Sequence, residues 1–335
     1  WRAREVSSFE TVPAAWLYLL RVQVGLVYVC AGFAKLQTDW LLHAQPLRIW
    51  LGASTELPML GEIFTWPGAP LVMSWFGFLF DTSIVGFLLA SRTRPYAYLV
   101  VLVFHVMTKL LFDIGMFPAI MSASALVFFS PSWPRVFAAQ LDRVKARIAK
   151  RPRSSIDSPR STAFVHDAGT AVFSPLGRFA VVLAALYVVV QVALPFRSAL
   201  YGGNVLWHEQ GMRFSWRVMV RAKGGAATFY VKTPDDAREI PVDPRRYLTR
   251  FQENEMAGQP DLLLQMAHHI GREFEARGPG PVRVRADTHV SLNGRRAVPL
   301  IDPSVDLMTI HDGLGPASWI LPAPTSPPPH TRPVL

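Results

Sequence analysis

The sequence predicts a mainly α-helical membrane protein, in which a polytopic bundle of transmembrane helices precedes a small extracytoplasmic α+β domain. Half of the 335 residues are hydrophobic and only 17% are charged, whereas about a quarter of the residues of a soluble domain are charged. Several apolar runs are long enough to cross a ~30 Å hydrocarbon layer. Beyond about Leu200 the pattern changes to clustered β-branched and aromatic residues, which are typical of strands.

The first apolar run, Ala14 to Leu36, is the segment around which the chain is organised. At ~1.5 Å of rise per residue it is long enough to cross the membrane. It carries two cations, Arg21 and Lys35. Lys35 either extends to the interface as a snorkelling side chain, or faces inward, where burial keeps its amine partly neutral and usable as a base. Cys30 is the single cysteine, so an intramolecular disulfide is excluded and we interpret it as a packing residue.

Two further apolar runs carry titratable side chains. The second span is expected over Ala69–Ala90, with Asp81 near its middle. There Asp81 either pairs with a cation or hydroxyl inside the bundle or takes part in catalysis. The third span, Tyr96 to Phe112, carries His105 and Lys109, which share one helix face because they lie four residues apart. The shorter apolar run that follows, to Phe129, is predicted to be a half-span or re-entrant element.

The distribution of positive charge predicts the topology. A basic stretch at 135–177 is expected to be a cytoplasmic loop, and a last span is expected over 178–197. This places the interfacial loop at 37–68, with short surface helices, and the outer end of the first span on the extracytoplasmic side. Because the chain begins at Trp1 without a Met, we expect further spans ahead of the bundle at 1–134.

The extracytoplasmic domain is expected over 198–321, followed by a proline-rich, disordered tail at 322–335. Strands are predicted at 212–222 and 227–233, joined as a hairpin across Lys223–Gly225. A short strand and then a helix from Asp243–Pro244 are expected to follow. A second helix is predicted over Asp261–Arg277, where apolar residues lie three to four apart, and an alternating strand at 282–292.

Several classes of function are disfavoured. The net charge of +10 lies largely beside apolar runs, which fits the positive-inside rule better than nucleic-acid binding. The sequence has no dinucleotide-binding or phosphate-binding glycine motif and no HExxH motif. His268 and His269 are adjacent and therefore point to different helix faces, so we expect no metal site there.

Six motifs occur in the same order as in a known family. They are AGFAKLQTDW at 31–40, FHVMTKLLFDIGMF at 104–117, SPSWPR at 130–135, FSWRVMV at 214–220, IDPSVDL at 301–307 and SWI at 318–320. By these motifs the chain resembles the vitamin K-dependent γ-carboxylase family, as a bacterial-type homologue with an HTTM-like membrane domain. One departure is 211–216, which is one residue shorter than the corresponding stretch of eukaryotic members and lacks its tyrosines.

The resemblance implies a reaction and a site. The family oxidises reduced vitamin K, here of menaquinol or phylloquinol type, with dioxygen to the 2,3-epoxide, and couples this to carboxylation of a protein glutamate by carbon dioxide, without a metal. It implies Lys35 as the base and His105 as a group that stabilises developing negative charge. The residues expected to bind the cofactor are Asp39, Trp40, Lys109, Met116 and Phe117.

The expected partners are the lipid membrane and a protein or peptide glutamate substrate bound by the extracytoplasmic domain, with no nucleic acid. The expected location is a bacterial inner membrane, with the C-terminal domain outside. Three alternatives stay open: a quinol epoxidase or oxygenase that does not carboxylate glutamate, a non-catalytic quinone-binding membrane module, and a transporter. A buried Lys35 argues against the non-catalytic module, since a scaffold has no need of one.

Overall fold

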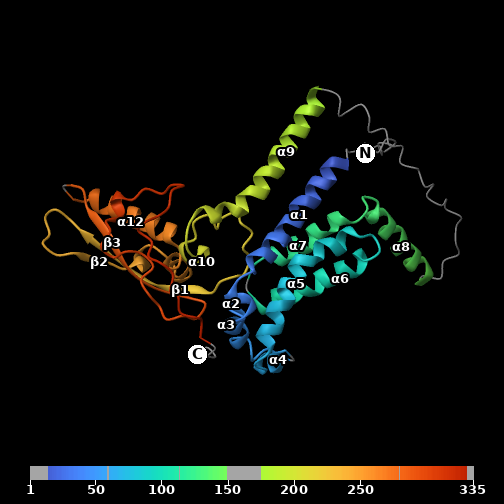
Figure 1. Cartoon of the computed structure of the whole chain (residues 1–335), viewed down its shortest axis with the longest axis horizontal. Coiled ribbons are helices and arrows are strands. Elements are labelled where there is room, and N and C mark those ends of the chain that lie inside the picture. The colour runs from blue at the N-terminus through green and yellow to red at the C-terminus, as the bar shows by residue number, and fades with distance from the viewer. Residues whose placement is uncertain (1–13, 59, 113, 149–174, 279, 330–335) are drawn as a thin grey trace. The chain divides into compact units, whose positions relative to one another are not determined.

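The computed structural model describes residues 14–58, 60–112, 114–148, 175–278 and 280–329 (Figure 1). The chain divides into two compact units. One comprises residues 1–27 with 84–191, and the other comprises residues 28–83 with 192–335. The unit boundaries therefore fall inside three long helices rather than between sequence segments.

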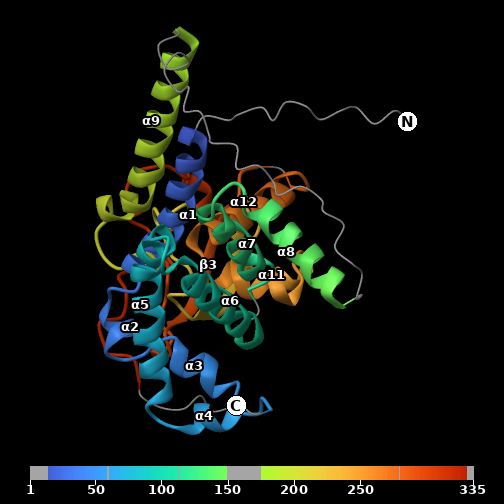
Figure 2. The ribbon, with the colours of Figure 1, turned by 90° about the vertical axis from the view of Figure 1, so that its right-hand side faces the viewer.

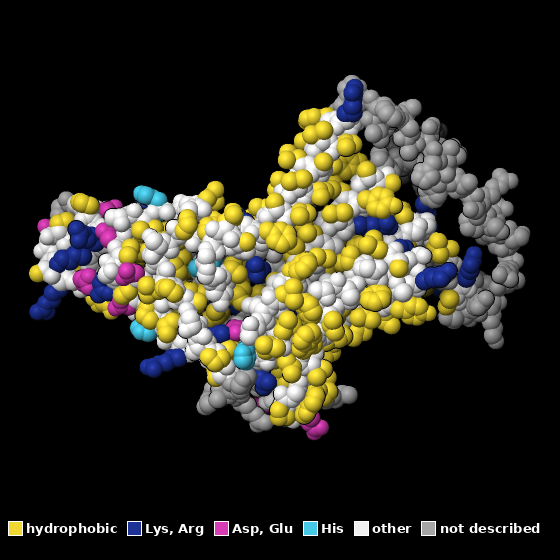
Figure 3. Space-filling model, in the orientation of Figure 1, with side chains coloured by type: hydrophobic (Ala, Val, Ile, Leu, Met, Phe, Trp, Pro, Cys, Tyr) yellow, Lys and Arg dark blue, Asp and Glu magenta, His cyan; other side chains and the backbone are white. Residues whose placement is uncertain are grey.

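In the described part of the chain, four helices are long and apolar enough to cross a membrane. They are α1 (Ala14–Ala34), α5 (Ala69–Leu89), α6 (Arg94–Leu111) and α9 (Pro175–Phe196). Their bounds agree with the predicted spans to within a few residues. Hydrophobic side chains cover most of the visible surface of α9 (Figure 3). This arrangement suits contact with lipid, because apolar side chains need no water and a helix forms its backbone hydrogen bonds within the segment.

The helix that follows α6 is shorter. It comprises α7 (Phe117–Ser124) and the 3₁₀ turn η1 (Ala125–Phe128), both packed against α6 (Figure 2). Arg21 of α1 donates hydrogen bonds of 3.0, 3.2 and 3.2 Å to the carbonyls of residues 127, 128 and 129. These bonds satisfy the carbonyls at the end of η1, where no backbone partner remains. A short apolar helix at this place agrees with the predicted half-span.

The start of the basic stretch is helical, which corrects the expected loop. Helix α8 spans Trp133–Ile148. Its apolar residues Phe137, Leu141 and Val144 recur three to four apart with charged residues between them, which is the helical period. Pro134 lies at its first turn, where a helix tolerates proline. The many basic residues of this segment mask the helical spacing of its apolar residues in the sequence. The remainder of the predicted loop, 149–174, lies outside the described residues.

Short helices occupy the segment between the first two spans, as predicted. They are α2 (Thr38–Leu41), α3 (Leu47–Gly52) and α4 (Gly61–Thr65). After α9, the 3₁₀ turn η2 (Arg197–Leu200) and α10 (Val205–His208) lead into the outer domain. Asn204 caps α10 by accepting a hydrogen bond from the Leu206 amide.

The outer domain is built on a three-stranded antiparallel sheet in the order β2–β1–β3 (Figure 1). Its strands are β1 (Lys223–Lys232), β2 (Ile240–Val242) and β3 (Arg283–Leu292). Helices α11 (Arg250–Ala257) and α12 (Pro260–Glu275) pack against it. The predicted helix and alternating strand are confirmed as α12 and β3. Residues buried in this core include Trp207, Phe229, Val231, Leu263, Ile270, Val284, Leu292 and Ile301.

Three local predictions in this domain are wrong, and the first two concern the segment that leads into β1. Lys223–Gly225 is not a hairpin turn but the start of β1, paired with the end of β3. The segment before it is irregular, because Phe214, Trp216 and Met219 have positive φ angles of 61°, 54° and 54°, which no strand contains.

The helix expected from Asp243–Pro244 is only a 3₁₀ turn, η3 (Pro244–Arg246). The α-helix begins at Arg250 instead, because Thr249 and Gln252 form a capping box there.

The tail expected to be disordered from Pro322 is placed as far as Pro329, although its backbone is irregular. Gln45 donates a hydrogen bond of 3.3 Å to the Pro329 carbonyl, and Arg295 donates one of 2.7 Å to the Ser326 carbonyl. Proline-rich segments lack internal hydrogen bonds, so contacts to the rest of the unit hold this one. The last 3₁₀ turn, η4 (Leu307–Thr309), precedes it. The proposed domain boundaries stay predictions.

Candidate active site

Lys35 lies immediately after the last residue of α1, at a point where α1 approaches α5 closely. A Cβ atom on Gly32 would lie 2.6 Å from the Thr82 side chain, so glycine permits this approach. The Lys35 Nζ donates a hydrogen bond of 2.6 Å to Asp81 Oδ2 and one of 3.2 Å to the Ala31 carbonyl. Only 5% of Lys35 and 6% of Asp81 is exposed.

This geometry decides whether Lys35 is buried or lies at the surface, and it gives Asp81 a cationic partner. Lys35 is buried against α5 and does not snorkel to the surface. Asp81 has the cationic partner that one of the two hypotheses required. Such a pair is held tightly, because separating two opposite charges in a medium of low dielectric constant is costly.

Trp40 completes the surroundings of the lysine. The Lys35 Nζ lies 5.1 Å from the centroid of the Trp40 ring, which is within the range of a cation–π contact. The indole Nε1 donates a hydrogen bond of 2.8 Å to the Ser74 carbonyl, and the Ser74 hydroxyl donates to the Trp40 carbonyl. Trp40 is 3% exposed. The indole ring is therefore fixed on α5 beside the amine.

Asp39 is engaged by the outer domain. Its Oδ1 and Oδ2 accept hydrogen bonds of 2.7 and 2.6 Å from the two terminal nitrogens of Arg295, and Oδ2 accepts another of 2.8 Å from Asn293. Burial disfavours the carboxylate, but the hydrogen bonds from Arg295 and Asn293 outweigh this effect, so the pKa of Asp39 lies below its ordinary value. Cofactor binding by Asp39 stays a prediction, and both of its oxygens already have protein partners.

The remaining predicted site residues belong to the other compact unit. His105 is buried, and its Nδ1 lies 3.2 Å from the Ser122 hydroxyl. Lys109, on the same face of α6, is exposed, as is Met116, and Phe117 is half-buried. The structure thus brings Lys35, Asp39 and Trp40 together in one unit, whereas His105, Lys109, Met116 and Phe117 belong to the other.

Sequence reasoning missed Arg295 and Asn293. The only local signal was the Asn293-Gly294 pair after an alternating strand, which predicts a turn. A turn signal does not reveal a binding partner. Among the described residues no group of three or more His, Cys, Asp or Glu side chains could hold a metal ion.

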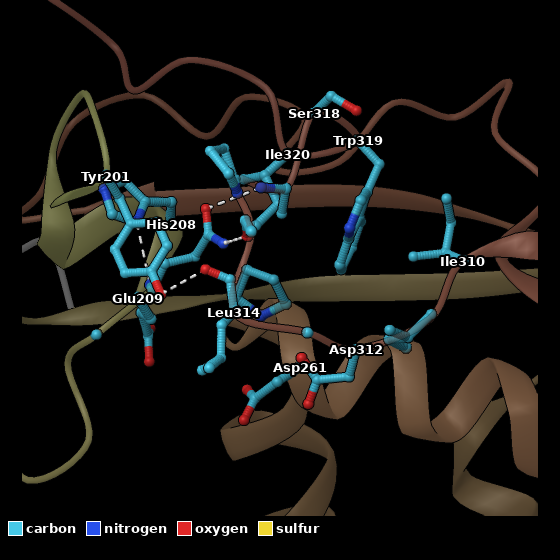
Figure 4. Close-up of a pocket in the computed structure, with 18 of the residues that line it drawn as sticks. Tyr201, His208, Glu209, Asp261, Ile310, Asp312, Leu314, Ser318, Trp319 and Ile320 are labelled. Atoms are coloured by element: carbon cyan, nitrogen blue, oxygen red, sulfur yellow. Dashed lines mark hydrogen bonds between the residues drawn. The ribbon is translucent and has the colours of Figure 1, made fainter. Parts of the chain in front are cut away.

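A concave site lies within the outer domain (Figure 4). It is a cavity of about 540 Å³, lined by the segment 197–213, the start of α12 and the loop 309–320. Gln210 and Tyr201 hold this loop. Gln210 donates to the Gly315 carbonyl at 2.8 Å and accepts from the Ala317 amide at 3.1 Å, and the Tyr201 hydroxyl donates to the Leu314 carbonyl at 3.0 Å.

Two nitrogen atoms of the lining residues are buried without a hydrogen-bond partner among the described residues: Arg197 Nε and His208 Nε2. The His208 Nδ1 accepts a hydrogen bond of 3.0 Å from the Gln210 amide, so the neutral ring carries its proton on Nε2. Burial, and then the charge of Lys223, lower the pKa of His208. Unpaired buried donors are rare and costly.

Both halves of the chain match known families. Residues 2–133 match the family model of the HTTM domain, and residues 176–326 match that of the vitamin K-dependent gamma-carboxylase, lumenal domain. The chain belongs to the vitamin K-dependent gamma-carboxylase family. No solved structure matches it.

Membership of the vitamin K-dependent gamma-carboxylase family confirms the resemblance carried by the six motifs. The protein is a multi-pass membrane protein with a lumenal C-terminal domain. The predicted fold class, apolar helices followed by a domain with helices and a three-stranded antiparallel sheet, is also confirmed. The Asp39–Arg295 ion pair joins the two family matches, since Asp39 lies in the HTTM match and Arg295 in the lumenal-domain match.

Proposed function

We propose that this protein is a hydroquinone-dependent γ-glutamyl carboxylase in which Lys35 is the base that initiates the reaction. The observation that carries the proposal is the buried Lys35–Asp81 pair, with Nζ and Oδ2 2.6 Å apart, at the end of the first span of a vitamin K-dependent gamma-carboxylase family member. A structural bundle gains little from a buried ion pair, because the cost of removing two charges from water offsets their attraction.

The residues around Lys35 fit reduced vitamin K. Trp40 offers an aromatic ring and Lys35 an amine, which suit the aromatic ring and the hydroxyl groups of a hydroquinone. When bound, this cofactor would supply, through its oxidation by dioxygen, a base strong enough to remove a γ-proton from glutamate. The roles of His105, Lys109, Met116 and Phe117, which belong to the other compact unit, stay proposals.

The Lys35–Asp81 pair supplies the first proton acceptor. A lysine ammonium cannot accept a proton, so the pair must first pass the proton on Lys35 Nζ to Asp81 Oδ2. Both side chains are then neutral, and the amine has a free lone pair. Burial of the pair also excludes water, which would otherwise quench a strong base.

The cavity of the outer domain is the proposed place for the peptide substrate. Arg197 and His208 line this cavity, and side chains of these two types bind the carboxylate oxygens of a glutamate-rich peptide. Charge-assisted hydrogen bonds of this kind are stronger than neutral ones.

The proposed function is tested with purified protein in nanodiscs, supplied with reduced vitamin K, dioxygen, ¹⁴C-bicarbonate and a glutamate-containing peptide. Wild type, Lys35→Ala and the exposed control Lys145→Ala are compared. Epoxide is measured by chromatography and peptide label by scintillation. We expect both products from wild type and Lys145→Ala, and about a hundredth or less of either from Lys35→Ala.

The other outcomes distinguish the alternatives. Epoxide that depends on Lys35, without labelled peptide, would support a quinol oxygenase that acts on no glutamate. Absence of epoxide from folded wild-type protein would reject the base assignment and favour a non-catalytic quinone-binding module. For the cavity, Arg197→Gln is expected to raise the KM for peptide about tenfold or more while epoxide formation without peptide is unchanged.

A further inference from the structure

We infer that Arg295 is a positioning residue for Lys35: the turn of the outer domain at 293–295 holds Asp39 and thereby fixes the loop that carries the proposed base. This inference rests on the proposed function only for its kinetic consequences. It gives the outer domain a part in placing the catalytic group, in addition to any part in binding a substrate.

The contact between Arg295 and Asp39 has the geometry of a fixed joint. The two terminal guanidinium nitrogens bind the two carboxylate oxygens at 2.6 and 2.7 Å, and Asn293 adds a third bond of 2.8 Å. The side chains of Arg295 and Asp39 are only 10% and 12% exposed. A bidentate arginine–carboxylate pair fixes orientation as well as distance, and salt screens it little because it is largely buried.

The outer domain holds its side of the joint rigidly. Asn293 is fully buried. Its backbone amide donates a hydrogen bond of 2.7 Å to the Ala222 carbonyl, and its side-chain oxygen accepts one of 2.9 Å from the Ala222 amide. Its φ of 52° is one that asparagine tolerates better than most residues. The Arg295 Nε is bonded to the Ser326 carbonyl. Each donor to Asp39 therefore has its own support in the outer domain.

On the membrane side, short links connect Asp39 to Lys35. The next residue, Trp40, lies against the Lys35 ammonium and makes two hydrogen bonds with Ser74 of α5. Ser74 and Asp81 are seven residues apart on α5, which is about two helical turns, so they lie on one face. The segment 35–40 is thus held on one side by the outer domain, through Asp39, and on the other side by α5, through Trp40 and the Lys35–Asp81 pair.

This arrangement predicts a specific kinetic effect. In Arg295→Lys the charge is kept but the forked contact is lost, so Asp39 and Trp40 lose their fixed orientation and Lys35 its alignment with Asp81. Misplacing a catalytic group lowers the rate of the chemical step more than it lowers affinity. A direct role for Asp39 in binding the cofactor predicts the opposite result, a raised KM for hydroquinone.

The experiment compares wild type, Arg295→Lys, Asn293→Ala and the matched control Arg296→Lys, an exposed neighbour of Arg295. Two readouts are taken in nanodiscs: kcat and KM for hydroquinone epoxidation, and the rate at which Lys35 reacts with an amine-selective reagent, followed by mass spectrometry. For Arg295→Lys we expect kcat to fall about tenfold or more with KM unchanged, and Lys35 labelling to accelerate about tenfold. Asn293→Ala is expected to change kcat and the Lys35 labelling rate in the same directions but by smaller factors. Arg296→Lys is expected to change neither quantity.

Each other outcome has one meaning. Unchanged kcat and labelling in both Arg295→Lys and Asn293→Ala would overturn the inference, and so would a raised KM with unchanged kcat. If wild type forms no epoxide but Lys35 labelling still depends on Arg295, the proposed function fails and the positioning role stands. If wild type forms epoxide and the variants match it in both readouts, the positioning role alone fails.

Discussion

The buried ion pair between two long helices differs sharply from the ion pairs at the rim of the outer domain, although that domain also buries one pair, Lys223–Glu209. Lys35 and Asp81 are sealed between α1 and α5, with side chains only 6% and 8% exposed. In the outer domain the core is apolar, and pairs such as Arg245–Glu253 lie at the rim, where the Arg245 side chain is 66% exposed. Charged side chains gather over this domain in the space-filling view (Figure 3). The same kind of bond therefore has very different consequences when it is broken in the two regions.

The largest effect is expected from breaking the sealed pair. Lys35→Ala leaves the Asp81 carboxylate buried without its cation, so we expect a loss of about 3–5 kcal/mol in the free energy of unfolding. We also expect epoxide formation to fall by about 10²–10⁴-fold, the usual contribution of a general base. Thermal unfolding in detergent and epoxide chromatography measure the two effects.

A double variant separates stability from chemistry. Lys35→Met with Asp81→Leu removes both charges and fills the same space with apolar groups, so stability is expected to return to within about 1 kcal/mol of wild type or above it. Activity stays lost, because no amine remains. Recovery of activity in the double variant would contradict the role of Lys35.

The second effect concerns the apolar core. Phe229 of β1 is fully buried in the core of the outer domain, and Phe229→Ala is expected to cost about 3–5 kcal/mol through lost burial and a residual cavity. The measurement is thermal unfolding, with Phe251→Ala as the control, since Phe251 is 74% exposed. Equal effects of the two substitutions would show that the outer domain does not depend on this core.

A smaller effect is expected from the pH dependence of the Asp39 joint. The pKa of Asp39 is lowered in the folded protein, so the ionised group stabilises the fold above its unfolded pKa. This stabilisation is lost as the pH falls through the lowered value. The difference in unfolding temperature between wild type and Asp39→Asn should therefore be constant above the ordinary aspartate pKa of 3.8 and shrink below it. A difference that grows on acidification would contradict the assignment.

The smallest effect is expected at the rim. Arg245→Gln removes a solvent-exposed partner of Glu253, and exposed ion pairs contribute little because water and salt screen them. We expect no measurable change in unfolding temperature or in epoxide formation. A clear destabilisation would remove the contrast between the sealed and the exposed pairs.

The long helices, and the presence of a lysine within the first of them, were predictable because their signals are local, whereas the burial of that lysine was one of two open alternatives. A cation within an apolar run is visible in any window that contains it, and the spacing in α12 and β3 gives the faces that they bury. The partners were not predictable in this way. Asp81 lies 46 residues from Lys35, and Arg295 lies 256 residues from Asp39. No pattern within a segment states which distant segment it will contact.

Two misassigned segments show a different limit. Phe214, Trp216 and Met219 are bulky apolar residues that favour strands, yet all three have positive φ angles that interrupt one. Only contacts in the folded state can impose such a conformation on them. In α8 the apolar residues have the helical spacing, which is visible in the sequence, and a high positive charge does not by itself distinguish a loop from a helix. The irregular backbone at 214–219 is therefore not predictable from the sequence, whereas helix α8 is.

The joint between Asp39 and Arg295 also bears on how this chain can be recombined with its relatives. The two family matches end at residue 133 and begin at residue 176, which invites exchange of whole outer domains at the intervening segment. The joint crosses that boundary, so a chimera with a foreign outer domain leaves Asp39 facing whatever side chain replaces Arg295. An exchange of outer domains will succeed only where the residues at positions 39 and 295 are exchanged together. The smallest segment that can be exchanged is therefore larger than either family match.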